Sequence, residues 1–363
     1  MTGIVVTHAL PGSDDEHERA THSAIAETLA AIKGWAFGGA YDADGRYDEP
    51  LYFVPSNTLE VHGARALGIR GPHDLFGGVV PHAFVATKAI VHPLVAPDAV
   101  APPGWAPQFA RRVQEVVLPG FTAFSARDAR RAAGALLSQG TIRLKPAWGV
   151  GGHGQLCVDD GAGMEAALAA LDPAQLAGCG LCIELDLADT TTFSVGQVRV
   201  GELQATYHGT QRTTTNNRGH VVFGGSDLFV ARGGWDALAA LLLPPEVATA
   251  VQQAKLFDAA TAEFAGLFAS RRNYDLVRGR DARGNWRSGI LEQSWRIGGA
   301  SGAEAAALAA FRADPALRGV HARCVETYGG ASAPAGAIVH FCGVDRRVGA
   351  LTKYTVVEAH ETA

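Results

Sequence analysis

The chain has 363 residues, of which 47% are hydrophobic and 18% charged, a composition typical of a soluble globular protein with two or three subdomains. Its formal net charge of −5 and the lack of Lys/Arg runs argue against a nucleic-acid partner. No segment has the 18 apolar residues of a membrane helix, and five cysteines, an odd number, indicate no disulfide framework, so we expect a cytoplasmic protein without a membrane partner.

The first part of the chain predicts an open α/β layer. Residues 4–6 form a short apolar strand, and the capping-box sequence at 13–16 predicts a helix that runs to about Lys33. A second strand is expected at 51–54 and a second helix at 58–67. A strand, a short turn and a helix at the start of the chain are typical of an α/β domain.

The most informative stretch is the segment 141–155, TIRLKPAWGVGGHGQ. A short strand ends at Lys145-Pro146, four glycines follow within six residues, and the next residues predict a second strand at 155–159. Because glycines let backbone N–H groups approach an anion closely, we expect a β-hairpin flap that folds over phosphates. The candidate phosphate-binding residues of this loop are Gly149, Gly151, Gly152, His153 and Gly154.

Two other phosphate-binding motifs do not fit this loop. A dinucleotide-binding turn needs a helix that begins inside the loop, and a Walker A loop needs Gly-Lys-Ser/Thr, which does not occur here. Lys145 would supply the positive charge behind the flap. The chain has only five lysines against 26 arginines, so a retained lysine more often sits where a compact ammonium is needed. An exposed strand end beside a flexible loop is the alternative.

Acidic residues occupy the strand that is predicted at 181–187. Glu184 and Asp186 alternate with apolar residues, so their carboxylates should point to one face of a sheet. An ordinary solvent-facing surface is the alternative to a binding role. Two strands within 192–212 and two further helices are expected after this strand.

Two carboxylates are expected to meet late in the chain. Strands predicted at 274–277 and 288–295 pair across a turn, and antiparallel pairing would bring Asp275 near Glu292. Such carboxylates repel each other unless a cation or a proton lies between them. Mg²⁺ suits this arrangement, because it takes one or two carboxylates together with nucleotide phosphates. A surface ion-pair cluster that includes Arg296 is the alternative.

In this order, the Lys-Pro strand end, the glycine hairpin, the acidic strand and the late carboxylate strand resemble the ATP-grasp superfamily, of the carboxylate-amine ligase kind, over roughly 84–302. The whole chain also resembles an uncharacterised bacterial family known only as a domain of unknown function. The resemblance implies that Lys88 contacts the α-phosphate of ATP, with a snorkelling surface lysine as the alternative. It also implies that Glu184, or else Asp186, binds the adenine or the ribose.

The resemblance further implies roles on the metal strand. Glu292 matches the carboxylate that bridges magnesium ions, and Arg296 matches the basic position. Ser294 stands where the superfamily usually has Asn, and its shorter side chain puts a second magnesium ion in doubt. Gln293 should alternate to the opposite face and replace that Asn poorly unless a bulge intervenes.

The expected fold class is mixed α/β, with an N-terminal open α/β domain at 1–115, a small ATP-grasp subdomain with the hairpin lid at 116–185, and a larger antiparallel-sheet subdomain at 186–363. The resemblance implies an ATP- and Mg²⁺-dependent ligase that activates a carboxylate as an acylphosphate for attack by an amine or similar nucleophile. Lys145 and Arg296 are the expected catalytic residues. A kinase-like phosphotransferase and a nucleotide-binding protein without turnover are the alternatives. The expected partners are small-molecule substrates, and a homodimer is left open.

Overall fold

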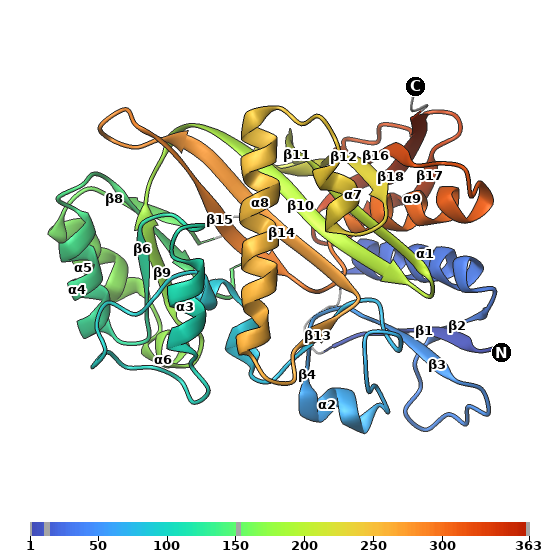
Figure 1. Ribbon diagram of the computed structural model, residues 1–363, viewed down its shortest axis with the longest axis horizontal. Helices are drawn as coiled ribbons and strands as arrows, with labels where there is room; N and C mark the ends of the chain where they lie inside the picture. Colours follow the sequence, from blue (N-terminus) through green and yellow to red (C-terminus); the bar gives the residue numbers. More distant parts are fainter. Residues whose placement is uncertain (1, 11–14, 150–153, 361–363) are drawn as a thin grey trace.

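The computed structural model of the protein describes residues 2–10, 15–149 and 154–360. Its strands form four sheets, and Figure 1 shows a small sheet with its helices at one end, a large sheet through the middle and an N-terminal layer at the other end. The predicted mixed α/β class is confirmed. No helix in the described part of the chain is long and apolar enough to cross a membrane.

The N-terminal layer is a parallel sheet with the strand order β2-β1-β3. Its strands are β1 (Ile4–His8), β2 (Ala36–Ala40) and β3 (Leu51–Pro55). Helix α1 (Glu16–Lys33) connects β1 to β2 and ends at Gly34, whose φ of 65° is the left-handed conformation that favours glycine. The predicted strands and helix are therefore confirmed, whereas the first residues of the predicted capping box lie outside the described residues.

A second, three-stranded sheet joins the N-terminal layer to the rest of the molecule. It consists of β4 (Leu59–Glu60), β5 (Gly78–Val80) and β13 (Phe268–Ala269). The helix expected at 58–67 is shorter, α2 (Val61–Ala66), because β4 takes the residues before it. The chain then forms two 3-10 turns, η1 (Ala83–Ala86) and η2 (Lys88–Ile90), and helix α3 (Pro107–Val113), which share a core with the large sheet.

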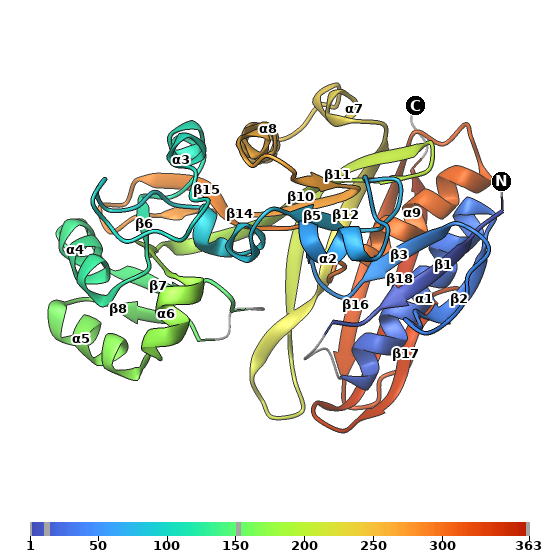
Figure 2. The ribbon, with the colours of Figure 1, turned by 90° about the horizontal axis from the view of Figure 1, so that it is seen from below.

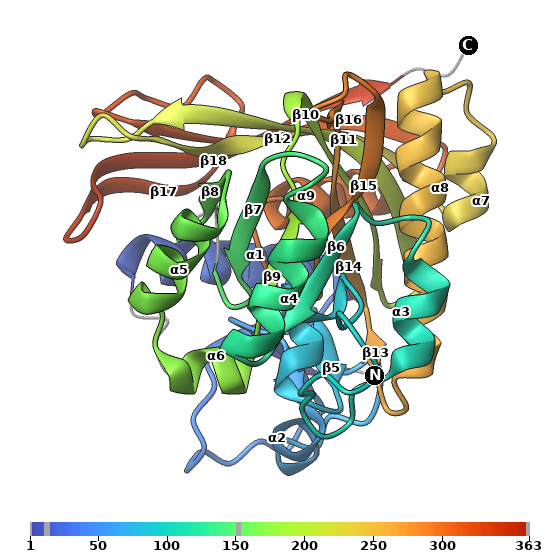
Figure 3. The same cartoon turned by 90° about the vertical axis from the view of Figure 1, so that its left-hand side faces the viewer.

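The small sheet has the strand order β6-β9-β7-β8 and contains the predicted hairpin. Its strands are β6 (Gly120–Ala123), β7 (Ile142–Pro146), β8 (Leu156–Val158) and β9 (Leu181–Leu185). Helices α4 (Ala126–Leu136), α5 (Gly161–Ala170) and α6 (Pro173–Cys179) accompany it, and Figure 3 shows α4 and α5 lying over the sheet. Antiparallel pairing of β7 with β8 confirms the strand, glycine loop, strand arrangement.

Alternation along β7 and β9 separates two faces of the small sheet. The apolar residues Ile142, Leu144, Ile183 and Leu185 are buried in one core with the helices. Arg143 pairs with Glu184 across the two strands, and Lys145 lies two residues further along, so these polar side chains share the other face. The strand expected at 181–187 ends at Leu185, which places Asp186 just beyond it.

The large sheet is antiparallel and has eight strands in the order β15-β14-β10-β11-β12-β16-β18-β17. The strands are β10 (Ala188–Val200), β11 (Leu203–Thr215), β12 (Val221–Arg232), β14 (Arg271–Arg280), β15 (Trp286–Ser294), β16 (Gly319–Tyr328), β17 (Ile338–Asp345) and β18 (Gly349–His360). The helical segments are α7 (Trp235–Ala239), α8 (Pro245–Ala260), η3 (Thr261–Glu263) and α9 (Ser301–Ala313).

Two helices fix the N-terminal layer against the large sheet. Helices α1 and α9 lie side by side, and their apolar side chains belong to one buried cluster with β11, β12 and β16 (Figures 1 and 2). Helix α8 covers the strands β10, β14 and β15, as Figure 1 shows. The first turn of α1 and the segment after β15 are thereby held near each other.

Candidate functional site

A cleft of about 1540 Å³ lies between the small sheet, the large sheet and the first turns of α1. Figure 2 shows β7 and β8 on the left of the molecule, α1 on the right and the β11–β12 hairpin between them. The predicted site residues that line this cleft are Lys88, Lys145, Asp275, Glu292, Ser294 and Arg296. Predicted site residues that lie up to 208 positions apart, from Lys88 to Arg296, therefore contribute to one cavity.

Lys145 is held by a buried pair of partners. Its side chain is only 4% exposed, and its Nζ contacts Oε1 of Glu184. The other oxygen of Glu184 lies 2.9 Å from Nε2 of His92, which is fully buried. Burial by itself raises the pKa of Glu184, but the ammonium of Lys145 and the hydrogen bond from His92 outweigh it and lower the pKa to about 2. Glu184 therefore stays ionised and fixes the ammonium.

Lys88 connects the small sheet to strand β15. Its backbone N–H donates to the carbonyl of Ala147 at 3.3 Å, and its Nζ contacts the carbonyl of Gly149 in the glycine loop. The same ammonium lies 2.5 Å from Oε2 of Glu292. The side chain of Lys88 is 10% exposed, so the snorkelling alternative does not describe it. Its contact with the nucleotide stays a prediction.

The carboxylates of Asp275 and Glu292 lie on directly paired residues of β14 and β15. The register shifts by one residue just beyond this pair, so that Leu291 is bulged between Ile290 and Glu292. Burial first, and then the charge of Glu292, raise the pKa of Asp275 to about 6. Two carboxylates in this position suit a cation, because a cation would offset both the burial of Asp275 and its repulsion from Glu292.

Asp275 also has neutral donors around it. The amide of Asn273 donates to Oδ1 of Asp275 at 2.9 Å, and the hydroxyl of Ser194 lies 3.3 Å from the same oxygen. These bonds fix the carboxylate without neutralising its charge. Within the described ranges no group of three or more His, Cys, Asp or Glu forms a metal-binding cluster, so the protein would supply two carboxylates and a nucleotide would supply the other oxygens.

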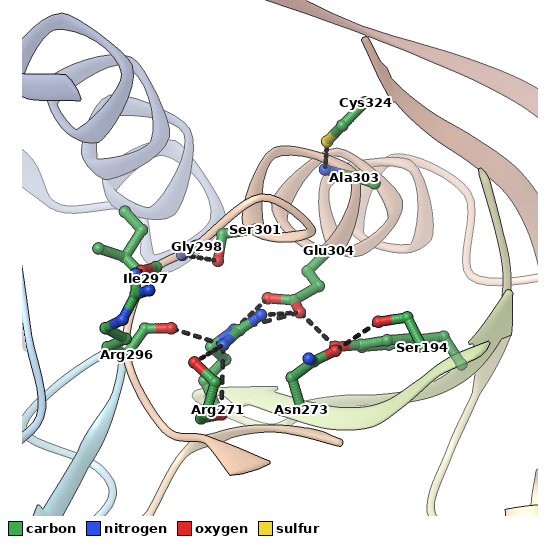
Figure 4. A network of polar contacts seen from close by, with 12 residues as sticks. Ser194, Arg271, Asn273, Arg296, Ile297, Gly298, Ser301, Ala303, Glu304 and Cys324 are labelled. Carbon is green, nitrogen blue, oxygen red and sulfur yellow. Dashed lines mark hydrogen bonds and ion pairs between the residues drawn. The ribbon is translucent and has the colours of Figure 1, made fainter. Parts of the chain in front are cut away.

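A buried ion pair supports the segment that follows the metal strand, as Figure 4 shows. Arg271 of β14 is 1% exposed, and its Nε and Nη2 donate to the carboxylate of Glu304 of α9 at 2.9 Å and 2.8 Å. Its remaining nitrogen, Nη1, donates to the carbonyls of Ser294 at 3.3 Å and Arg296 at 2.5 Å. Tyr207 donates to Glu304 at 2.6 Å. Arg271 thus holds both ends of the turn that presents Arg296.

Arg296 has no carboxylate partner among the described residues. Its Nη1 donates to the carbonyl of Ile297 at 2.9 Å, and the rest of the guanidinium lines the cleft. Burial, and next the charge of Arg271, lower the pKa of Arg296, while Glu292 and Glu18 oppose the shift. A half-buried guanidinium with unused donors is suited to an anionic ligand.

Other predicted residues lie outside the cleft or outside the described chain. Glu184 lies beneath the cleft with both oxygens in use, and Asp186 forms an ion pair with Arg143 at 2.6 Å. Gly154 has a φ of 74°, in the left-handed region that favours glycine. Gly151, Gly152 and His153 fall outside the described residues. The roles of all these residues toward a nucleotide stay predictions.

Sequence reasoning missed several supporting residues. Arg271, Asn273 and Asp275 share one face of β14 at a spacing of two, and that alternation was a usable signal. Glu304 is the one acid within the apolar run of α9, where a charge is rarely buried without a partner. The partners His92 and Gln293 carried no signal, because their contacts come from distant segments.

Solved structures with a similar overall fold are ATP-grasp enzymes, and the chain has the ATP-grasp fold. It is similar to the ADP complex of PurK, N5-carboxyaminoimidazole ribonucleotide synthetase, with 11% identity, a TM-score of 0.55, and coverage of 98% of this chain and 92% of that one. It is also similar to phosphoribosylamine-glycine ligase from Thermotoga maritima, with 15% identity, a TM-score of 0.53, and coverage of 99% and 93%. At such identities the likeness shows the fold alone.

A third similar structure is N5-carboxyaminoimidazole synthase from Aspergillus clavatus in complex with ADP and 5-aminoimidazole ribonucleotide. It has 11% identity and a TM-score of 0.52, and the match covers 98% of this chain and 94% of that one. No curated protein matches the chain. A family described as protein of unknown function (DUF3182) matches residues 5–355, so the chain belongs to the DUF3182 family.

Proposed function

We propose that the protein is an ATP- and Mg²⁺-dependent ligase, which activates a carboxylate as an acylphosphate for attack by an amine or a similar nucleophile. The observation that carries this proposal is that Lys88, Lys145 and the Asp275–Glu292 pair line one cleft. The names of two similar structures, a ligase and a synthetase in complex with ADP, support it. We also propose that the three functional units are residues 1–115, 116–185 and 186–363.

The nucleotide end of the cleft is the part nearest the small sheet. Two ammonium groups, on Lys88 and Lys145, would neutralise the phosphates, and the glycine loop would cover them with backbone donors. Both lysines are almost completely buried, so their charges act in a medium where electrostatic interactions are strong. Asp186, just beyond β9, would be the better candidate for the ribose, because both oxygens of Glu184 have partners, whereas Arg143 contacts Oδ1 of Asp186.

Asp275 and Glu292 would hold Mg²⁺ together with the β- and γ-phosphates, and Ser294 would stand beside them. When bound, this ion neutralises charge on the transferred phosphoryl group. The residues fit the ion, because burial and the charge of Glu292 raise the pKa of Asp275, and the charge of Arg271 offsets them only in part. The ammonium of Lys88 contacts only Glu292 of the pair.

The residues of the chain would act mainly by positioning and charge. Lys145, fixed by Glu184, would orient the γ-phosphate for in-line attack by the carboxylate oxygen of the substrate, with ADP as the leaving group. Arg296, fixed by Arg271, would hold the acylphosphate. The nucleophile would then attack the acyl carbon, inorganic phosphate would leave, and the proton of the amine would pass to solvent.

Ser294 favours one alternative, a nucleotide-binding protein without turnover. Its hydroxyl lies 3.4 Å from Nη1 of Arg271 and is a shorter ligand than the Asn that the superfamily usually has. A kinase-like phosphotransferase would use the same residues and stop at phosphoryl transfer.

The test is ADP release from ATP and Mg²⁺ in the presence of a panel of carboxylates and amino acids, with and without added amines. A ligase needs both substrates for full ADP release. A kinase-like enzyme needs one, and a protein without turnover binds ATP but releases no ADP with any member of the panel. Failure to bind ATP at all would contradict the proposal.

A further inference from the structure

Gln293 follows Glu292, the proposed metal ligand, on strand β15. Successive residues of β15 point to opposite faces, so Gln293 faces away from the pair that it adjoins. Its side chain is buried, with 4% of the residue exposed. The proposed function gives it no role.

The amide of Gln293 binds the backbone just before Lys88. Its Nε2 donates to the carbonyl of Val85 at 3.0 Å and to the carbonyl of Thr87 at 2.7 Å. These carbonyls flank the junction of η1 and η2, where Lys88 begins the second turn. Both amide hydrogens are therefore used on one short segment, which lies about two hundred residues earlier in the chain.

The same segment is tied to the small sheet through the backbone of Lys88. Its N–H donates to the carbonyl of Ala147 at 3.3 Å, and its carbonyl accepts from Sγ of Cys182 at 3.2 Å. Two bonds from Gln293 of the large sheet, to Val85 and Thr87, and two bonds from the small sheet, to Lys88, are thus made to one short segment, residues 85–88. The ammonium of Lys88 then reaches Glu292, the immediate neighbour of Gln293.

We propose that Gln293 is a positioning residue, which fixes the ammonium of Lys88 for the phosphates of the nucleotide and links its position to the metal carboxylate Glu292. This inference rests on the proposed function. Without the two amide bonds, the carbonyls of Val85 and Thr87 would be buried without these donors, and the segment would rearrange to satisfy them. Lys88 would then lose its place relative to Glu292.

The test compares Gln293→Met, Lys88→Met and the double variant with the unaltered protein, with ATP–Mg²⁺ and adenosine as the probes in calorimetric titrations. We expect Gln293→Met to weaken ATP binding about tenfold, within the range for coupled residues of one network, and to leave adenosine binding unchanged. In the Lys88→Met background, Gln293→Met should have no further effect on ATP. If Gln293 only stabilised the fold, Gln293→Met would weaken ATP binding by the same factor with and without Lys88.

Gln253 provides a matched control. It is a buried amide on α8, 9% exposed, whose Nε2 donates to the carbonyl of Ser288 on the same strand β15 at 3.1 Å. We expect Gln253→Met to lower the melting temperature comparably but to leave the ATP affinity unchanged. If Gln293→Met does not fold, Gln293→Asn, a shorter amide that cannot span the same contacts, is measured in its place.

Unchanged ATP affinity in the Gln293 variant would overturn this inference but not the proposed function. The same would follow if Gln293→Met weakened ATP binding equally in the unaltered protein and in the Lys88→Met background. Weakened adenosine binding of the same size would overturn it too, because the effect would not pass through the phosphates. If the unaltered protein binds no ATP, the proposed function fails and the inference fails with it. Titration of the unaltered protein with ATP–Mg²⁺ distinguishes failure of the proposed function from failure of this inference alone.

Discussion

The ammonium nitrogen of Lys88 lies 2.5 Å from Oε2 of Glu292, so two residues that are 204 positions apart in the chain are in direct contact. Glu292 is paired with a second carboxylate, Asp275, and Lys88 also contacts the backbone carbonyl of Gly149 in the glycine loop. This ion pair thus joins the proposed phosphate-binding end of the cleft to its proposed metal-binding end. The predictions below test the two ends separately.

Replacement of Lys145 by Met should abolish ATP turnover and destabilise the protein. The substitution leaves the carboxylate of Glu184 buried without its ammonium, which costs about 3–5 kcal/mol for a buried pair. Denaturant unfolding measures the stability, and titration with ATP–Mg²⁺ measures the affinity. Lys255→Met is the control, because Lys255 forms only a solvent-exposed pair with Asp236 and should change neither quantity. Full ATP affinity and turnover in Lys145→Met would remove our central assignment.

Glu184 should make stability depend on pH in the acid range. Its pKa is lowered to about 2 in the folded protein from an ordinary value of 4.5, so its contribution is present above about pH 4.5 and is lost as the pH falls toward 2. Glu184→Gln should therefore cost about 3 kcal/mol near neutral pH and progressively less in acid. Denaturant unfolding from pH 7 to pH 3 measures the difference from the unaltered protein. A difference that does not change with pH would contradict the ionised pair.

Asp275 should make stability depend on pH in the opposite sense to Glu184, because its ionised form is disfavoured in the folded protein. Its folded pKa is raised to about 6 from 3.8, so the folded protein binds the proton more tightly and this group reduces stability as the pH rises through that range. Asp275→Asn should raise the melting temperature at pH 8 but not at pH 4. Magnesium-dependent ATP binding by the unaltered protein should weaken as the pH falls below about 6, because a protonated carboxyl is a poor ligand. Equal Mg²⁺ dependence at pH 5 and pH 8 would contradict a role for Asp275 in metal binding.

Ser294→Asn tests whether the departure from the usual superfamily residue limits metal binding. Ser294 lies directly opposite Asn273 on the paired strand, at the cleft surface. The longer amide would add an oxygen ligand, so we expect the Mg²⁺ concentration for half-maximal ATP binding to fall, by up to about tenfold. Ser294→Ala is the control and should leave or raise that concentration. No change in the Asn variant would show that position 294 does not face the ion.

Much of the arrangement could be predicted from sequence because its signals are local. The Lys145-Pro146 strand end, the glycine loop and the strand after it predict a hairpin, and β7 and β8 confirm it. Alternation and turn spacing likewise predicted the pairing of Asp275 with Glu292. These features depend on residues that are neighbours in the chain or related by a short turn.

The supporting contacts could not be predicted, because they depend on how the sheets pack together. Glu184 contacts Lys145 because β9 lies beside β7. His92, which bonds to Glu184, comes from an irregular segment. Gln293 looked like a poor substitute for a metal ligand, and its actual contacts lie on the opposite face. Alternation along β15 predicted the face on which Gln293 lies, but not which residues pack against that face.

The central claim is tested most directly by a crystal structure of the protein with a non-hydrolysable ATP analogue and Mg²⁺. We predict that the phosphates lie between Lys88 and Lys145 beneath the glycine loop, with the ion bound by Asp275 and Glu292. A nucleotide bound elsewhere, or one whose γ-phosphate lies away from Lys145 and Glu292, would contradict the account.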